Sequence, residues 1–162
     1  SAASDVYKRQ IQDEKALVNK FRENLELYFD SITRGEEFKK SSSKKEILWV
    51  DDRPENNVYE RNILEKYGLT FSLALSTQQA LHYMKHNKFA LIISDMGRKE
   101  GIREGYVLLE EIRKMDKKIP FIIYAGSKKK EHVDEALRRG AQGCTNNPGE
   151  LIDLVLKNLL KN

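Results

Sequence analysis

Three aspartates stand where apolar runs of the sequence end. Asp51 and Asp52 follow the run at residues 47–50, and Asp95 follows the run at residues 90–94. Adjacent carboxylates repel each other, and burying one without a partner is costly. A divalent cation among them removes this cost, and Mg²⁺ binds carboxylates while keeping several of its waters. The three residues therefore predict a magnesium site, provided that both runs end at the same edge of a sheet.

The remaining pattern predicts such a sheet. Short apolar runs indicate strands at residues 47–50, 70–74, 90–94, 120–124 and 143–145. Segments with helical periodicity lie at residues 54–67, 77–87, 105–116, 130–139 and 149–161. Alternating strands and helices are typical of an α/β fold with a parallel sheet covered on both faces. Ligands of such sheets bind beyond the carboxyl ends of the strands, where the three aspartates stand.

Some polar residues near these ends have a purely structural explanation. Ser76 and Asn147 stand at expected helix starts, each with Gln or Glu three positions later, and fit helix caps. Asp52 with Glu55 also fits a capping box, with Pro54 in the first turn. Taken alone, this capping box explains Asp52 without a metal; together with Asp51 and Asp95, the metal site is favoured.

The N-terminal segment predicts an amphipathic helix over residues 11–35. Its apolar residues recur three and four positions apart, as in a coiled-coil seam; they are Val18, Phe21, Leu25, Tyr28 and Ile32. Gly35 is a stop signal for this helix, and residues 36–45 are a polar linker. The seam is expected to pack on a second copy, forming a homodimer, or to fold back on its own domain.

Residues 1–10 are not used to predict the fold. The segment DVYKRQ at positions 5–10 looks like a translated library adapter, so residues 1–10 are expected to be an artefact and not native sequence. The true N-terminus stays open.

Composition narrows the function classes. The formal net charge is +4 with 33% charged residues, and the lysine clusters do not interleave with aromatic residues as in a nucleic-acid platform. No nucleic-acid partner is expected. The one cysteine, Cys144, excludes an internal disulfide and fits a cytoplasmic location. No apolar run approaches the ~18 residues of a membrane span, so the chain is expected to have no membrane segment of its own.

Five segments together resemble the receiver domain of two-component response regulators, over about residues 46–160. In the family's order and roughly its spacing they read ILWVDDRPEN, ALIISDMG, GYVLLEEIR, IPFIIYAGS and RGAQGCTNNP. The resemblance implies a flavodoxin-like fold for residues 46–162. This fold is a doubly wound parallel sheet of five strands in the order 2-1-3-4-5, here with the amphipathic helix in front of it.

The resemblance also implies a chemistry. Receivers accept a phosphoryl group from a histidine kinase or phosphotransfer protein, on the aspartate that ends strand three. By position this acceptor is Asp95. The family's Mg²⁺ ligands map to Asp95, Asp52 directly, Asp51 through water, and the backbone carbonyl of Gly97. A downstream protein partner would receive the signal.

Three positions depart from the family pattern. Ala125 stands at the end of strand four, where receivers carry a Ser or Thr that hydrogen-bonds the phosphoryl group. Asn147 replaces the lysine that pairs with the phosphoryl charge, and Cys144 replaces the aromatic switch residue of strand five. The loop at residues 96–104 lacks the usual proline and is about two residues longer.

Three functions stay open at this point. The leading one is an atypical receiver that is not an enzyme, accepts a phosphoryl group at Asp95 with Mg²⁺ and acts through a protein partner. In that case Ser127 or Lys128 are candidate substitutes for the missing groups. The loss of those groups favours the alternative, a pseudo-receiver that binds partners independently of phosphorylation. A phosphohydrolase using the three carboxylates with Mg²⁺ is the third.

Since no DNA-binding output domain is expected after Asn162, output should pass through the face of strands four and five or the N-terminal helix.

Overall fold

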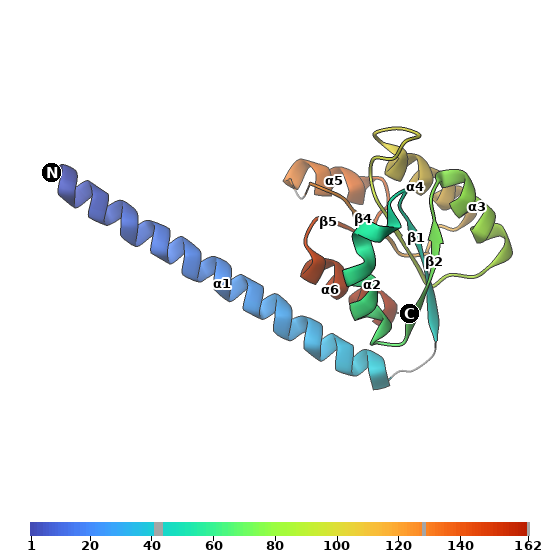
Figure 1. Ribbon diagram of the computed structural model, residues 1–162, viewed down its shortest axis with the longest axis horizontal. Helices are drawn as coiled ribbons and strands as arrows, with labels where there is room; N and C mark the ends of the chain where they lie inside the picture. Colours follow the sequence, from blue (N-terminus) through green and yellow to red (C-terminus); the bar gives the residue numbers. More distant parts are fainter. Residues whose placement is uncertain (41–43, 128, 162) are drawn as a thin grey trace.

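The computed structural model describes residues 1–40, 44–127 and 129–161. A long helix precedes an α/β domain with a five-stranded sheet (Figure 1). The strands are β1 (Lys45–Val50), β2 (Leu69–Ala74), β3 (Leu91–Ser94), β4 (Phe121–Tyr124) and β5 (Gly143–Thr145). The helices are α1 (Ala2–Lys40), the 3₁₀ helix η1 (Pro54–Asn57), α2 (Val58–Glu65), α3 (Thr77–His86), α4 (Glu104–Met115), α5 (Lys130–Arg138) and α6 (Pro148–Leu160).

All strand pairs are parallel, in the order β2-β1-β3-β4-β5. This confirms the predicted α/β fold and its strand order. In the α/β domain, the predicted elements end within two residues of the observed ones, with η1 and α2 taken together, which is the usual uncertainty of helix and strand ends.

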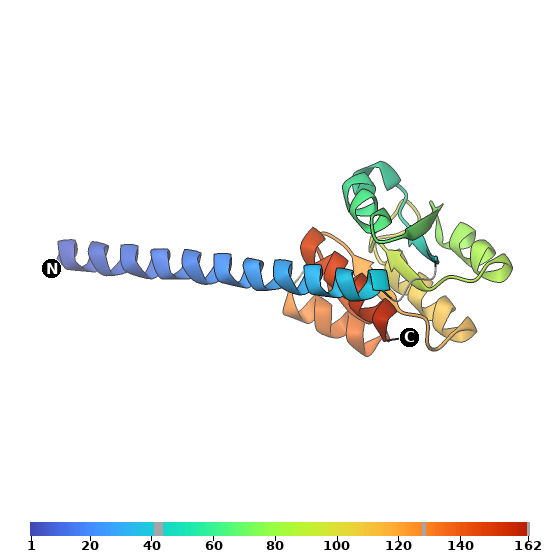
Figure 2. The ribbon, with the colours of Figure 1, turned by 90° about the horizontal axis from the view of Figure 1, so that it is seen from below.

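The sheet is covered on both faces because its central strands are apolar on both faces. Leu48 and Val50 of β1 join a cluster with residues of α3, α4 and α5. The alternate residues Ile47 and Trp49 join a second cluster with residues of α2 and α6. Helices therefore form a layer on each side of the sheet (Figures 1 and 2). A pocket lined by Asp51, Asp52 and Asp95 lies at the carboxyl ends of the strands.

Helix caps were predicted correctly at two positions. Ser76 Oγ accepts a hydrogen bond from Gln79 N at 3.1 Å, and Asn147 Oδ1 accepts one from Glu150 N at 3.0 Å. The capping alternative for Asp52 is wrong. Arg53, not Asp52, stands at the cap position of η1, and no side chain of the described residues caps that helix. Asp52 is left for another role.

The predicted end of the N-terminal helix is also wrong. α1 continues through Gly35 to Lys40, so residues 36–40 are helical and not linker; residues 41–43 lie outside the described ranges. Gly35 is buried, and a Cβ there would collide with the ring of Tyr67. Glycine is needed at this position for close packing against the domain, and not to end the helix.

The end of α1 packs on α6. Phe38 is 4% exposed in the cluster with α6, and Arg34 Nε lies 2.6 Å from Asp153 Oδ1. Packing on its own domain, one of the two expected alternatives, is therefore observed for this end. The rest of α1 extends away from the domain (Figures 1 and 2), and Val18 and Phe21 are 54% and 64% exposed. The side chain of Tyr28 lies outside the description.

No helix within the described ranges combines the length and the apolar character that crossing a bilayer requires.

Candidate phosphoacceptor and metal site

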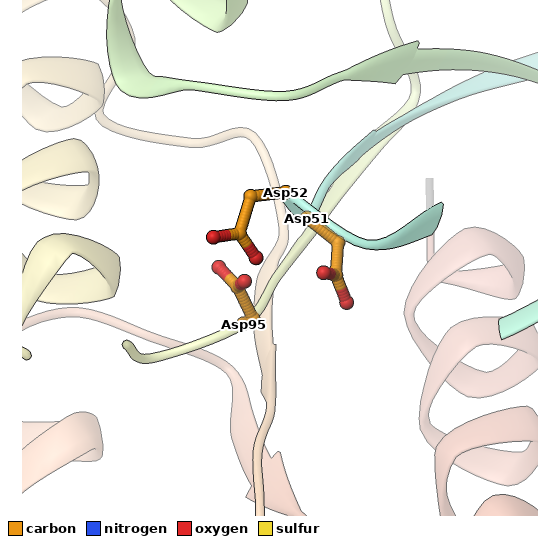
Figure 3. A group of neighbouring side chains, drawn as sticks. All are labelled: Asp51, Asp52 and Asp95. Carbon is orange, nitrogen blue, oxygen red and sulfur yellow. The ribbon is translucent and has the colours of Figure 1, made fainter. Parts of the chain in front are cut away.

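The three aspartates meet at the carboxyl edge of the sheet. The backbone ladder continues past the strands, since Asp51 N donates to Ala74 O at 2.9 Å and Asp95 N to Val50 O at 3.1 Å. These bonds fix Asp51, Asp52 and Asp95 beside one another. One carboxylate oxygen from each lies within 4.8 Å of those of the other two. The predicted cluster is confirmed as a geometric arrangement (Figure 3).

Hydrogen bonds divide the cluster into two kinds of carboxylate. Asp51 uses both oxygens, accepting from Arg53 N at 2.8 Å and from Asn57 Nδ2 at 2.7 Å. Asp52 accepts through Oδ2 only, from Lys99 N at 3.0 Å. Within the described part of the chain, Asp52 Oδ1 and Asp95 Oδ2 accept no hydrogen bond.

This division fits a magnesium ion. Figure 3 shows the carboxylates of Asp52 and Asp95 facing each other, while that of Asp51 points to the other side. Two facing carboxylates with an oxygen to spare suit direct ligation, and a carboxylate already held at both oxygens suits contact through a metal-bound water. The donor set thus fits the ion that the family implies. Gly97 lines the same pocket of about 720 Å³, and ligation by its carbonyl stays a prediction.

Asp95 is the most buried of the three carboxylates. Its residue is 9% exposed, and burial raises its pKa from the ordinary 3.8 to about 7. The hydrogen bond and charge of Arg98 lower this pKa, while the charges of Asp51 and Asp52 raise it. A divalent cation would oppose the effect of burial, because it favours the charged carboxylate.

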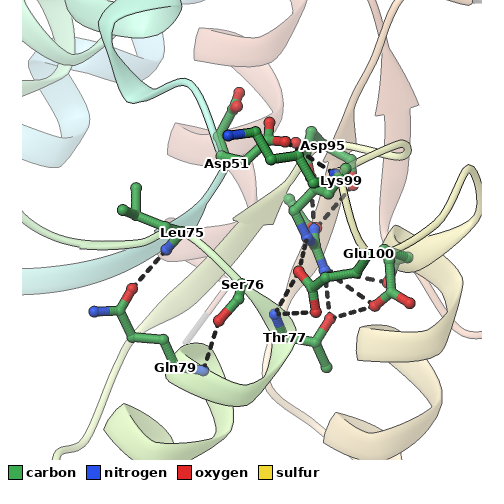
Figure 4. Close-up of polar contacts among 12 residues, drawn as sticks. Asp51, Leu75, Ser76, Thr77, Gln79, Asp95, Lys99 and Glu100 are labelled. Carbon is green, nitrogen blue, oxygen red and sulfur yellow. Dashed lines mark hydrogen bonds and ion pairs between the residues drawn. The ribbon is translucent and has the colours of Figure 1, made fainter.

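A buried arginine that the sequence reasoning missed faces Asp95. The side chain of Arg98 is 0% exposed, and its Nη1 donates to Asp95 Oδ1 at 2.5 Å. Its Nη2 donates to Thr77 Oγ1 at 2.5 Å. Figure 4 shows Asp95, Thr77 and Glu100 gathered around these contacts. The available signal was the loop that is longer than usual, with an arginine three positions after Asp95.

The local backbone explains how an arginine becomes buried here. Arg98 and Gly101 form an isolated antiparallel bridge, with bonds of 2.9 and 3.0 Å between their N–H and carbonyl groups. This tight turn directs the side chain of Arg98 inward and brings the N–H of Lys99 to Asp52. Gly105 then donates to Met96 O at 2.8 Å. A Cβ at Gly105 would collide with the backbone carbonyl of Asp95, so only glycine lets α4 start this close to Asp95.

The three departing switch positions have structural roles. Ala125 lines the pocket and donates its N–H to Thr145 O at 3.1 Å. Cys144 is 5% exposed in the core, and burial raises the pKa of its thiol, so it is not activated as a nucleophile. Asn147 caps α6 and carries no charge. These positions supply neither a hydroxyl nor a cation to Asp95.

Ser127, one of the two candidate substitutes, lies outside the pocket of the aspartates. Ser127 Oγ lies 2.6 Å from His132 Nδ1 and lines a neighbouring pocket with Cys144, not the pocket of the aspartates. The structure therefore does not bring Ser127 to Asp95. Lys128 lies outside the described residues.

Comparison with known proteins decides the family. The family model described as the response regulator receiver domain matches residues 47–157. The chain belongs to this family. It is thus a receiver of two-component signalling, and receivers are in general signalling modules and not enzymes.

Individual relatives agree with this assignment. The transcriptional regulatory protein ZraR of Escherichia coli (strain K12) is 31% identical over 96 residues, which cover 59% of this chain and 21% of that protein. An uncharacterized 14.6 kDa protein of Leptolyngbya boryana is 26% identical over 115 residues, covering 70% of this chain and 86% of the relative. The receiver thus spans about a fifth of the length of the ZraR relatives.

A solved structure shows the same fold. A CheY-like response regulator receiver domain protein from Methanospirillum hungatei JF-1 has a TM-score of 0.63 and 26% identity. The match covers 74% of this chain and 96% of that chain.

Proposed function

We propose that this receiver accepts a phosphoryl group on Asp95, with Mg²⁺, from a phosphohistidine of a histidine kinase or phosphotransfer protein. The observation that carries this proposal is the facing pair of carboxylates, Asp52 and Asp95, each with an oxygen that accepts no hydrogen bond from the described residues. Asp95 supplies the nucleophile, and the modified receiver then acts through a downstream protein partner.

The transfer is a substitution at phosphorus. A carboxylate oxygen of Asp95 attacks the phosphorus, and the new P–O bond forms as the P–N bond to the partner's imidazole breaks. The leaving nitrogen keeps the electron pair of the broken bond. Asp52, Asp95 and the Gly97 carbonyl would hold Mg²⁺ directly and Asp51 through water. The ion, when bound, neutralises charge on the phosphoryl oxygens.

The chain's own residues prepare this step. Arg98 fixes the Asp95 side chain and favours its ionised form, which the attack requires. The N–H of Lys99 holds Asp52 in place across the pocket. The acylphosphate adds about −1.5 to −2 charge at the end of β3, and a charge of this size reorders nearby loops in other proteins.

A second candidate is an interaction module that works without phosphorylation. The observation that favours it is the neutral character of Ala125, Cys144 and Asn147, which supply neither a hydroxyl nor a cation to a phosphoryl group at Asp95. The retained acidic cluster favours the first candidate. The two differ in whether Asp95 becomes modified.

The test is incubation with the small phosphodonor phosphoramidate and Mg²⁺, followed by intact-mass measurement. The wild-type chain should gain the mass of one phosphoryl group, and Asp95→Asn should gain none. Asp30→Asn, which removes an exposed carboxylate on α1, is the matched control and should behave as wild type. Wild-type protein that stays unmodified under these conditions would leave the interaction module as the function.

We also propose that α1 pairs with α1 of a second copy, since Val18 and Phe21 of the coiled-coil seam are exposed. Sedimentation of the full chain should give a dimer, and Val18→Glu with Phe21→Glu should give a monomer. Leu17→Glu, at a position outside the seam that is 69% exposed, is the control. A wild-type monomer at micromolar concentration would contradict this pairing.

A further inference from the structure

We propose that Arg98 couples the charge state of Asp95 to the first turns of α3 and α4, so that the response to phosphorylation runs to the α3–α4 side of the domain. This inference rests on the proposed function, because it starts from a phosphoryl group on Asp95. It goes beyond it by naming the residue that transmits the change and the helices that receive it.

Three carboxylates share the buried guanidinium of Arg98. Asp95 Oδ1 lies 2.5 Å from Nη1, Glu100 Oε1 lies 3.3 Å from Nε, and Glu104 Oε2 lies 3.8 Å from Nη2. One cation has five donors in a fixed planar fork, so a stronger anion at one side draws it away from the others. A phosphoryl group on Asp95 is such an anion. Arg98 should then move toward Asp95 and away from the two glutamates.

The contacts of Arg98 end on the starts of two helices. Its Nη2 donates to the hydroxyl of Thr77, the first residue of α3. That hydroxyl donates in turn to Glu104 Oε2 at 2.7 Å, and Glu104 is the first residue of α4. Thr77 N also donates to Glu100 Oε1 at 3.3 Å. A displacement of the guanidinium thus disturbs hydrogen bonds that hold both helix starts.

The second anchor of Arg98 lies in β3 itself. Nη1 also donates to Ser94 Oγ at 3.1 Å, and Ser94 Oγ donates to Asp95 O at 2.8 Å. The guanidinium is therefore fixed at the acceptor end by two partners, so the change at Asp95 reaches it directly. Among the described residues at the β4 and β5 ends, Ala125 and Asn147 carry no charge that could form a comparable connection.

Amide chemical shifts measured by NMR test the coupling with the full chain and without any phosphodonor. The spectra are recorded above pH 8, where Asp95 is ionised, so Asp95→Asn removes the carboxylate charge but keeps the side-chain shape. In the wild-type background this substitution should shift the amides of Thr77 and Glu104. In an Arg98→Gln background the same substitution should leave the chemical shifts of both amides unchanged. Arg103→Gln, on the same loop but paired with Glu135, is the control background and should keep the shifts.

Two further variants distinguish coupling through Arg98 from a folding defect and from a purely structural role of this side chain. Arg98→Lys keeps a cation but loses the fork, so it should keep a response at Asp51 and Asp52 and lose it at Glu104. Thr77→Val removes only the hydroxyl and should abolish the response of Glu104 while local shifts at Ser94 remain. Shifts at Thr77 and Glu104 that persist in the Arg98→Gln background would overturn the inference.

Adding beryllofluoride and Mg²⁺ as a phosphoryl mimic separates this inference from the proposed function. If wild type binds the mimic and Arg98→Gln still transmits the shift to Thr77, the inference is wrong and the proposed function stands. If wild type does not bind the mimic, the proposed function is wrong. The Asp95→Asn comparison then still decides whether Arg98 couples the two sites.

Discussion

The ends of β3 and of the pair β4–β5 lie at one edge of the sheet but carry opposite kinds of chemistry. Beyond β3, Asp95 and a fully buried Arg98 form an ionic network that reaches α3 and α4. In β5 and just beyond β4 and β5, Cys144, Ala125 and Asn147 are neutral and serve packing and capping. The fold brings both regions to the pocket that Asp95 lines. A few side chains, and not the fold, therefore determine which of the two can respond to added charge.

The largest expected effect is a loss of stability when the Arg98 network beyond β3 is broken. Arg98→Met should lower the free energy of unfolding by about 3–5 kcal/mol, because it leaves buried carboxylates without their cation. Urea denaturation measures this. Combining it with Asp95→Asn should recover part of the loss, since one of the unpaired charges is then gone. Equal losses for the single and the double variant would contradict the pairing.

Two glycines, one from each region, give the next comparison. Gly105→Ala should destabilise by about 1–3 kcal/mol, because the new methyl group overlaps the backbone of Asp95. Gly126→Ala, beside β4, is the matched control: nothing lies within 4 Å of a Cβ there. Urea denaturation of both variants should show a clear loss only for Gly105→Ala. Similar losses at both positions would mean that the start of α4 adjusts freely around the acceptor.

Stability and Mg²⁺ affinity should both depend on pH through Asp95. Asp95 has a folded-state pKa of about 7, above its ordinary 3.8, so between these values the folded chain binds more protons than the unfolded chain. In Mg²⁺-free buffer its contribution to the free energy of unfolding therefore falls as the pH rises through this range. Mg²⁺ binds the ionised form, so its affinity should rise over the same range.

Titration of Mg²⁺ at several pH values, followed by amide shifts or Trp49 fluorescence, measures this affinity. Asp95→Asn should lose the pH dependence between 3.8 and about 7. Asp52→Asn should bind Mg²⁺ more weakly than wild type. A wild-type affinity that does not change with pH in this range would contradict the assignment of Asp95 as a ligand.

The smallest expected effect lies in the β4–β5 region. Asn147→Lys should cost about 1 kcal/mol through the lost helix cap. Asn147→Ser keeps a capping oxygen and should cost less.

Ala125→Thr together with Asn147→Lys supplies the hydroxyl and the cation that other receivers carry. With beryllofluoride, this double variant should gain amide shifts on β5, measured against wild type, and the absence of such a gain would mean that further positions are degenerate.

Much of this arrangement could be predicted from the sequence because it depends on local pattern. The buried runs around Val50 and Ser94 determine the strands, and the strand ends determine where Asp51 and Asp95 lie. The cap at Asn147 follows from its own segment. These features need no knowledge of distant contacts.

The features that were missed depend on distant contacts. Gly35 has the type of a helix stop, but it packs on Tyr67, which is far along the chain. Asp52 has the spacing of a helix cap, but the loop after β3 brings the N–H of Lys99 to it. In the sequence Arg98 resembles the many surface charges of the chain, but in the structure the turn to Gly101 directs its side chain inward. Sequence periodicity carries no information on such turns.

Hydrogen exchange measured by mass spectrometry, on the wild-type chain with and without beryllofluoride and Mg²⁺, tests the difference between the two regions most directly. Exchange should change in peptides that cover residues 76–80 and 98–106, where Arg98 meets α3 and α4. Peptides that cover residues 143–148 should exchange as before. A change confined to residues 143–148, with none at the starts of α3 and α4, would contradict the role of Arg98 and return the response to the β4–β5 side.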